Sequence, residues 1–384
     1  MIKIKTTLIF GILAVFLVLS TVVTPTDSLG IKKILLVLTI LCGIIIDRSF
    51  FQNIKLIGSL AVAVLALIIF SLFNGSSFGA SITVLYPIVY IFVGIISADI
   101  GIDFEKIFSR VVICLSLIIT VTALLDMFHL LTIENNPVMN YISTTGEGQI
   151  STSSDAIFHY VIFLNGSPLI LYNVAKFGFQ RKYKLLLVSV LGLFFSGTRA
   201  NIYMAIIILL IIIIFSLKNL LLSILVFLAS LFGVEFLKYK NDSINQAKAS
   251  GDMVRELKLE SIKTELGNNF YNWNFGKGLG SYYYGPEQQV FNIVQYGYIN
   301  TSEWSYMELI RQGGIFGLII ILVIIIKPLV TLLRHKVYYA VIGLVSYLIV
   351  ATVDPFLITS TGFILYSVMY YLSKTIQFNQ DNSK

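Results

Sequence analysis

The sequence contains few charged residues, few histidines and few cysteines. Only 12% of its 384 residues are Asp, Glu, Lys or Arg, whereas a soluble domain would carry about a quarter. Three histidines are scattered along the chain, and both cysteines, Cys42 and Cys114, fall inside apolar runs. This scarcity excludes an ordinary soluble protein and a disulfide framework. It also gives no His–carboxylate or Asp-x-Asp cluster that would require a metal.

Apolar residues take the place of the missing charge. They make up 57% of the chain, and runs such as "AIIILLIIIIF" and "GLIIILVIII" have no polar face. Helices of this kind are surrounded by lipid or by each other. The composition therefore predicts an all-α polytopic membrane protein. The net charge of +7 is then explained by basic cytoplasmic loops under the positive-inside rule, and not by nucleic acid as a partner.

The apolar runs predict about twelve transmembrane helices. Lys3 and Lys5 precede the first run as in a secretory signal, but no convincing cleavage site follows, so we expect a retained first span. The predicted spans are 7–24, 31–46, 56–73, 82–98, 111–131, 159–175, 185–196, 201–217, 219–237, 305–326, 337–353 and 356–373.

The seventh and eighth spans are separated on the basis of length. A single helix over 185–217 would be about 50 Å long, whereas the hydrocarbon core of a bilayer is about 30 Å thick. The stretch "SGTRAN" contains Ser, Gly, Thr and Asn, which favour turns and caps. Arg199 in this turn is the single charged residue from Leu185 to Leu217. We therefore predict a helical hairpin with Arg199 at its tip.

The distribution of basic residues predicts the orientation. If both termini are cytoplasmic, the basic loops near residues 48–55, 106–110, 176–184 and 327–336 all face the cytoplasm. Arg199 then lies at the outer membrane boundary, where a charge costs less than at the bilayer centre. Residues 132–158 and 238–304 become long outer loops. The predicted organisation is nine helices in 1–237, a large outer loop in 238–304, and three helices with a cytoplasmic tail in 305–384.

The large outer loop contains a predicted helix and a glycine turn. Apolar residues recur at three- and four-residue steps over 243–268, which predicts an amphipathic helix carrying Arg255. The alternative for this helix is a solvated element with no part in chemistry. The following "GKGLGS" predicts a tight turn that includes Lys277, although it is weak evidence for a phosphate cradle.

Aromatic residues gather around this turn, including Tyr282, Tyr283 and Trp304. They fit an aromatic belt at the membrane interface. They also fit a surface on which ring faces pack against sugars. The residues alone leave both interpretations open.

The stretch "SEWSYMELIRQGG" opens the tenth predicted span. Glu308 and Arg311 are three residues apart and can pair on one helix face, either as a structural ion pair or as part of a binding site. Glu303 has no cation next to it in the sequence, which makes it the better candidate for a general base.

Four of these features together resemble the superfamily of bacterial Wzy-type O-antigen polymerases and O-antigen ligases. They are "FSGTRAN" at the tip of a hairpin, the late outer loop with Arg255 on its helix, the "GKGLGS" turn, and "SEWSYMELIRQGGIFGL" leading into a span. By motif the resemblance covers roughly residues 185–320. The ligases of this family place a histidine where this chain has Glu303, and that difference favours a polymerase.

The resemblance implies a metal-independent, cofactor-free glycosyltransferase with a GT-C-like fold in the bacterial cytoplasmic membrane. Its substrates would be undecaprenyl-diphosphate-linked oligosaccharides for a lipopolysaccharide O-antigen or a capsule, and a chain-length regulator is an expected partner. Arg199 and Arg255 would stabilise the diphosphate leaving group, and Glu303 would act as the base. Arg311, Lys277, Tyr282, Tyr283 and Trp304 would bind substrate.

Three other functions stay open at this stage. A glycan ligase would use the same chemistry on a different acceptor. A flippase for lipid-linked oligosaccharides would have two related halves and short outer loops, which this chain lacks. A membrane O-acetyltransferase would need a histidine-based site, and the three histidines are isolated.

Overall fold

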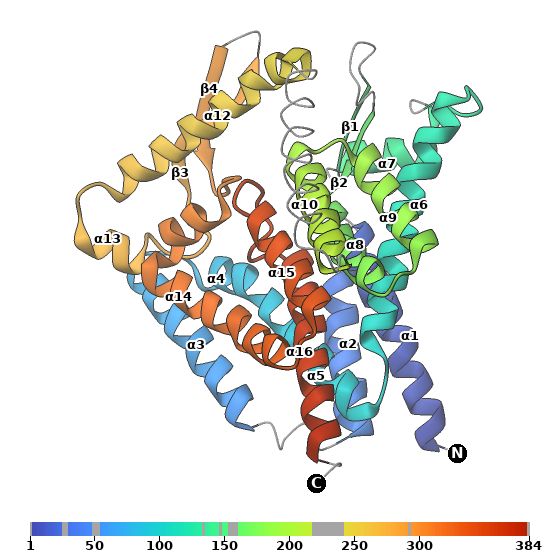
Figure 1. Ribbon diagram of the computed structural model, residues 1–384. Helices are drawn as coiled ribbons and strands as arrows, with labels where there is room; N and C mark the ends of the chain where they lie inside the picture. The colour runs from blue at the N-terminus through green and yellow to red at the C-terminus, as the bar shows by residue number, and fades with distance from the viewer. Residues whose placement is uncertain are drawn as a thin grey trace.

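The computed structural model describes residues 2–24, 30–47, 54–132, 135–145, 148–152, 160–216, 242–290 and 293–381. The chain is mostly helical, and its N- and C-termini lie at the same end of the molecule (Figure 1). The opposite end, called the far end below, carries helix α12 (Asp242–Leu266) and two β-hairpins. The helices between the two ends form the body of the protein.

The elements in the first half of the chain are mainly long apolar helices. Their bounds are α1 Ile2–Val23, α2 Ile31–Ile46, α3 Ile54–Phe73, α4 Phe78–Leu85, η2 Tyr86–Val89, α5 Tyr90–Ile100, α6 Phe104–Met127, α7 Pro137–Thr145, β1 Gly148–Thr152, β2 Tyr160–Leu164, η4 Ser167–Leu169, α8 Ile170–Phe179, α9 Tyr183–Ser196 and α10 Arg199–Ser216.

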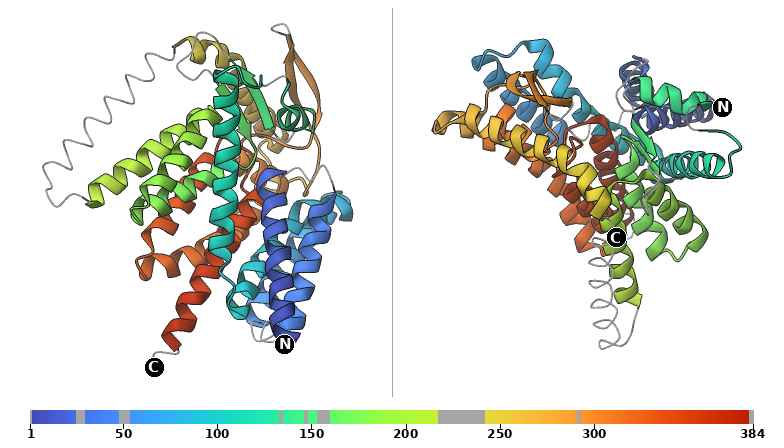
Figure 2. Two further views of the ribbon diagram at one scale, coloured as in Figure 1. Left: turned by 90° about the vertical axis from the view of Figure 1, so that its right-hand side faces the viewer. Right: turned by 90° about the horizontal axis from the view of Figure 1, so that it is seen from above.

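The second half contains most of the polar structure at the far end. Its elements are α12, α13 Phe270–Phe275, β3 Tyr283–Val290, β4 Ile293–Ile299, α14 Ser305–Arg334, α15 Tyr338–Val350 and α16 Ser360–Asp381. The side view and the view from above show α12 and the β3–β4 hairpin lying over α14 (Figure 2).

Four helical stretches in the described part of the chain are long and apolar enough to cross a membrane. They are Thr6–Val23, Phe78–Ile100, Phe104–Met127 and Ser305–Arg334, and four shorter apolar helices accompany them. Large hydrophobic side chains are exposed on these helices, such as Val323 at 60% and Val62 at 67%. Such exposure is unfavourable in water and expected in lipid. The predicted span 219–237 and the domain boundary at 237/238 lie outside the described residues.

The helices pack through close contacts that include hydrogen bonds. α5 lies against α16, where the Ser367 hydroxyl donates to the Tyr90 carbonyl over 2.8 Å. At the beginning of α16, the fully buried Lys32 ammonium of α2 donates to the Ser360 hydroxyl over 3.0 Å. Internal polar pairs of this kind are satisfied within the protein, because lipid offers no partner.

The structure corrects two expectations about secondary structure. The chain is not all-α, because β1 pairs with β2 and β3 pairs with β4, both antiparallel. The predicted helix over 159–175 is also wrong, since strand β2 and a turn precede α8 there. The stretch "YVIFL" is rich in β-branched and aromatic residues, and "NGSP" after it stops the strand with turn-forming residues.

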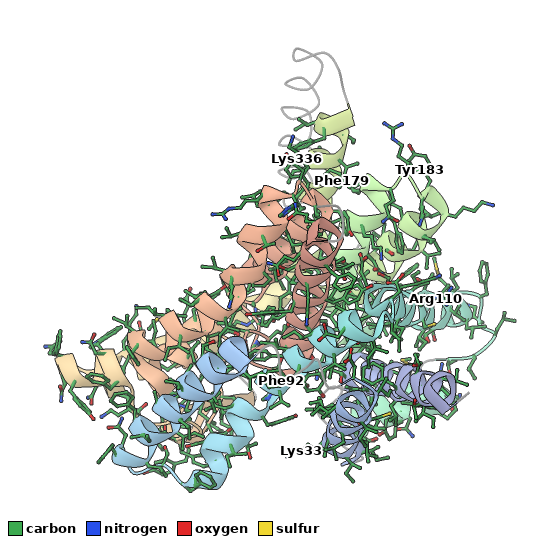
Figure 3. The ribbon with its side chains drawn as sticks, turned by 90° about the horizontal axis from the view of Figure 1, so that it is seen from below. Lys33, Phe92, Arg110, Phe179, Tyr183 and Lys336 are labelled. Atoms are coloured by element: carbon green, nitrogen blue, oxygen red, sulfur yellow. The ribbon has the colours of Figure 1, made fainter. Side chains whose placement is uncertain are left out.

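The predicted break at "SGTRAN" is confirmed. α9 ends at Ser196, Gly197 takes the left-handed conformation with φ 64°, and α10 begins at Arg199. At the other end of α10, the Phe215 ring lies 5.9 Å from Phe179 and 5.8 Å from Tyr338. Phe179 and Lys336 are both labelled in the view from below (Figure 3). The last turn of α10 therefore lies beside the beginning of α15. Arg199, at the opposite end of α10, lies toward the far end.

Candidate functional site

Helix α12 is held at the far end by one apolar face. Ile262 and Leu266 are fully buried against Tyr283 of β3, with Ile299 of β4 beside them. The predicted helix over 243–268 is therefore confirmed in type and nearly in extent, and it ends where expected, at Gly267 with φ 56°. This packing fixes the direction of the polar residues on the preceding turns.

Arg255 and Lys258 on α12 both reach Glu303, which precedes α14. The Arg255 Nε donates to the Glu303 Oε2, and the Lys258 Nζ lies 3.6 Å from the Glu303 Oε1. Glu303 has no cation next to it in the sequence, but the fold supplies two from residues more than forty positions earlier. The side chains of Arg255 and Glu303 stay 35% and 34% exposed, so the pair is open to solvent.

A third chain segment completes this cluster. The Ser305 hydroxyl donates to the carbonyl of Asp354, and the Leu357 amide donates to the same hydroxyl over 3.4 Å. These bonds fasten the loop 351–359, between α15 and α16, to the beginning of α14. Burial raises the pKa of the Asp354 carboxyl to about 6, helped by Glu303 and opposed by Arg255. The cluster thus contains two carboxyl groups in different environments.

Asp354 is a site residue that the sequence interpretation missed. It is the single ionisable side chain other than tyrosine between Tyr338 and Ser373. This is the same signal that drew attention to Arg199, a lone charge in a long apolar run. The sequence therefore contained the evidence, and the Asp-Pro pair that breaks the run at 354–355 marks the turn that places it.

Trp304 contributes to the same junction by bonding the helix backbone. Its indole Nε1 donates to the Arg255 carbonyl over 3.0 Å. This contact fixes the part of α12 that carries Arg255 against the residue next to Glu303. The geometry gives Trp304 a positioning role, since its polar atom is used within the protein.

Arg311 lies at the centre of a separate, buried cluster in the first turns of α14. Its guanidinium is fully buried and donates to both carboxylate oxygens of Glu308, confirming the predicted pair. It also donates to the hydroxyl and carbonyl of Ser281 at 3.0 and 2.8 Å, and its Cζ lies 4.7 Å from the ring centre of Tyr283. Arg311 thus joins the segment around Ser281 to α14.

Glu265 of α12 extends this buried cluster. Its carboxylate lies 3.6 Å from the Arg311 Nη1. Burial raises the pKa of Glu265, while Arg311 and then Lys277 oppose that shift. Lys277, expected to contact substrate, is therefore within electrostatic range of a structural carboxylate. Tyr283 is also buried, at 2% exposure, and burial raises its pKa to about 12.

The "GKGLGS" turn binds to an interruption in α14. Gly314 is non-helical, with φ 67° and ψ −178°, so the carbonyls before it lose their regular helical donors. The amides of Lys277 and Gly278 supply new ones, donating to the carbonyls of Arg311 and Gln312 at 2.7 and 2.9 Å. The predicted tight turn is confirmed by positive φ at all three of its glycines, and its amides serve the protein itself.

Tyr282 differs from the other aromatic residues named from the sequence. It is 62% exposed and lies just before β3. Arg199 is partly exposed and lies at the same end of the molecule as Arg255 and Glu303, on a different pair of helices. The structure thus brings Arg255, Glu303 and Trp304 together, and it places Arg311, Lys277 and Tyr283 in the adjoining buried cluster.

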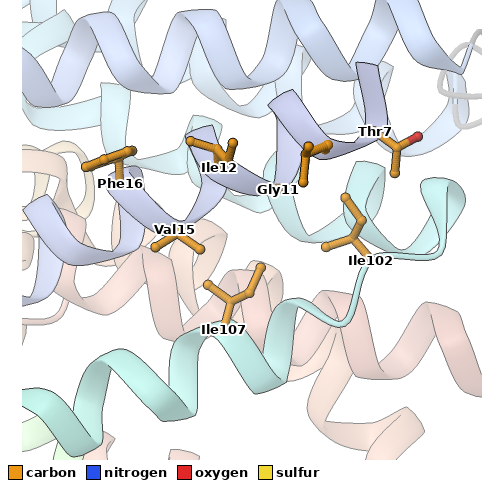
Figure 4. A pocket seen from close by; sticks show the side chains of 8 residues that line it. Thr7, Gly11, Ile12, Val15, Phe16, Ile102 and Ile107 are labelled. Atoms are coloured by element: carbon orange, nitrogen blue, oxygen red, sulfur yellow. The ribbon is translucent and has the colours of Figure 1, made fainter. Parts of the chain in front are cut away.

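An apolar cavity of about 920 Å³ lies elsewhere, between α1 and the beginning of α6 (Figure 4). Its lining includes Gly11, Ile12, Val15 and Ile107, with the Thr7 hydroxyl as the one polar side chain. This lining can accommodate hydrocarbon but offers no acid, base or cation for a reaction. Among the described residues, no group of three or more His, Cys, Asp or Glu could hold a metal ion.

Comparison with known proteins adds no assignment. No family model matches the chain, and no curated protein matches its sequence. The functional argument therefore depends on the membrane-type fold and on the far-end cluster of Arg255, Lys258, Glu303 and Asp354.

Proposed function

We propose that this chain is a polymerase of surface-polysaccharide repeat units. It joins undecaprenyl-diphosphate-linked oligosaccharides at the outer face of the bacterial cytoplasmic membrane, and it needs no metal or cofactor. In this proposal the chain has about twelve spans in a GT-C-like arrangement, with both termini in the cytoplasm. The shared position of the termini and the polar segments at the opposite end support this orientation (Figure 1).

The observation that carries the proposal is the pairing of Arg255 with Glu303. A guanidinium and a carboxylate, each about one-third exposed, lie together at the end of an apolar helical body. A lipid-linked substrate presents its head group at this level of the membrane, while its hydrocarbon stays in the bilayer. An arginine fork matches phosphate oxygens and keeps its charge at every physiological pH.

The proposed reaction is a glycosyl transfer with a lipid diphosphate as the leaving group. The hydroxyl of the acceptor oligosaccharide attacks the anomeric carbon of the donor sugar. The bond between that carbon and the phosphate oxygen breaks, and undecaprenyl diphosphate leaves with the electron pair. Glu303 takes the proton of the attacking hydroxyl. Arg255 and Arg199 stabilise the negative charge that develops on the leaving diphosphate.

The resting ion pair fits this cycle. Glu303 is held by Arg255 and Lys258. An arriving diphosphate competes for the same two cations and releases the carboxylate to act as a base. The diphosphate thus replaces the Glu303 carboxylate as the partner of Arg255 and Lys258. In this way substrate binding is coupled to activation of the base.

The test uses a strain that lacks the gene and receives variants of it on a plasmid. Arg199→Ala and Glu303→Gln should each abolish polymerisation, and Lys336→Ala at the opposite end serves as the control that should retain it. The readout is the ladder of lipid-linked glycans, with membrane-inserted protein measured in parallel. Normal chain lengths with Arg199→Ala would remove the diphosphate role, and full activity with Glu303→Gln would place the base elsewhere.

The same glycan profile separates the alternatives. Loss of a polymerase leaves single repeat units attached to the final acceptor. Loss of a ligase leaves finished polymer on the carrier lipid, and loss of a flippase leaves repeat units on the cytoplasmic side. The first pattern supports the proposal, and either of the other two overturns it.

A further inference from the structure

The β3–β4 hairpin presents four tyrosines on one face. Tyr284 is directly opposite Tyr298, and Tyr296 is opposite Pro286. Because side chains alternate between the two faces of a strand, Tyr282 and Tyr284 share a face with Tyr296 and Tyr298. The ring centres of Tyr284 and Tyr298 are 5.5 Å apart, and those of Tyr284 and Tyr296 are 5.9 Å apart. These four residues are called the tyrosine face below.

The tyrosine face is open, while the other face of the hairpin is covered. Exposure of the four side chains runs from 46% for Tyr296 to 76% for Tyr298. On the covered face, Tyr283 packs on Ile262 and Leu266 of α12. The hairpin therefore cannot turn its tyrosines inward without losing this packing, and their outward direction is fixed by α12.

The composition of the hairpin selects the kind of ligand. Apart from tyrosine, Glu287 is the single ionisable residue in β3 and β4, which also carry three glutamines. An anionic lipid head group requires cations, and an acyl chain or a protein helix is better matched by Leu, Ile and Phe. Aromatic rings with polar tips, beside neutral amides, suit a ligand with C–H faces and many hydroxyls.

We propose that the tyrosine face binds an extended glycan chain. The identity of that glycan rests on the proposed function, in which this protein handles surface-polysaccharide repeat units. The hairpin also has a direct connection to the reaction cluster, because Tyr298 is five residues before Glu303. Five residues span at most about 18 Å. A glycan of several sugars that reacts beside Glu303 is thus long enough to lie across the tyrosines.

The first experiment measures binding. Full-length protein in lipid nanodiscs is titrated with the polysaccharide of the source strain after its release from lipid, and with dextran as an unrelated neutral glycan. The double variant Tyr284→Ser/Tyr298→Ser should bind the strain polysaccharide about tenfold more weakly, since two exposed rings are lost. Tyr183→Ser is the matched control, an equally exposed tyrosine on α9 at the end that carries the termini.

A second pair of variants separates ligand binding from folding. Tyr284→Phe/Tyr298→Phe keeps both rings and should keep most of the affinity. If the Ser and Phe variants both match the parent protein in affinity, the proposal is wrong. It is also wrong if a Tyr298→Trp variant shows emission quenched by brominated acyl chains in the nanodisc, because the face would then lie in lipid. A change in that emission on adding the polysaccharide, without quenching by the brominated chains, would support glycan binding at the tyrosine face.

The cellular readout keeps this inference separate from the proposed function. In the complemented strain, the Ser double variant should shorten the modal polymer length while polymerisation continues. Unchanged length and unchanged binding, together with the loss of polymer caused by Arg199→Ala, would refute only the tyrosine face. If the Ser double variant loses binding and shortens the polymer while Arg199→Ala has no effect, only the role of Arg199 in the proposed polymerase reaction is refuted.

Discussion

Replacement of Arg311 by methionine tests whether this arginine holds the structure together or binds substrate. The variant keeps a long, flexible side chain and removes the charge. Glu308, 8% exposed, then loses its bidentate partner, and Ser281 loses the donor to its carbonyl. Removing one member of a buried ion pair costs about 3–5 kcal/mol. The link that Arg311 makes between Ser281 and α14 should therefore weaken severely.

The assay is thermal unfolding of the purified protein in detergent at one fixed scan rate, because such unfolding is generally irreversible. The loss should lower the apparent unfolding temperature by roughly 5–10 °C. The control is Arg334→Met, an exposed arginine at the other end of the same helix, which should stay within about 0.5 kcal/mol of the parent. Adding Glu308→Gln to Arg311→Met should recover part of the stability, because the stranded carboxylate is removed.

The opposite result is equally informative. An Arg311→Met protein that unfolds at the parental temperature and yet makes no polymer would refute the structural role. Arg311 would then have to reach the substrate, as the family resemblance implies.

Two further predictions concern the neighbouring residues. Asp354 has a raised pKa of about 6, so its ionised form costs stability, and that cost appears as the pH rises from about 4 to about 6. Asp354→Asn should thus be more stable than the parent at pH 8, with a difference that shrinks toward pH 4.5; a constant difference would contradict the assigned shift. Gly314→Ala should lower the unfolding temperature, because φ is 67° and an added Cβ would lie 2.0 Å from the Asn274 carbonyl oxygen. Gly313→Ala, whose nearest contact is 3.9 Å, should be tolerated, and equal effects of the two would disprove the reasoning.

Local features of the fold were predictable because local chemistry determines them. The turn at Gly197 follows from small residues in a run too long for one span, and the Glu308–Arg311 pair follows from helical spacing. The strands before α8 were missed because "YVIFL" is apolar enough to pass for part of a span. Its β-branched and aromatic content was the better guide.

The far-end cluster could not be predicted from local patterns in the sequence. Arg255 and Glu303 are 48 residues apart, and Asp354 is a further 51 residues along the chain. Their contact depends on how α12 packs on β3 and on how Ser305 fastens the loop 351–359. No periodicity in the sequence encodes these long-range arrangements, although the isolation of Asp354 in an apolar run was visible.

The four charged side chains of the far-end cluster have a consequence for the electrical balance within that cluster. Arg255 and Lys258 contribute +2, and Glu303 and Asp354 contribute −2 when both are ionised, so the sum is zero. One proton on Asp354 makes it +1. With both carboxyl groups ionised, these four side chains together neither attract nor repel ions strongly. A mildly acidic exterior would protonate Asp354 and thereby give the cluster a net positive charge that favours anions.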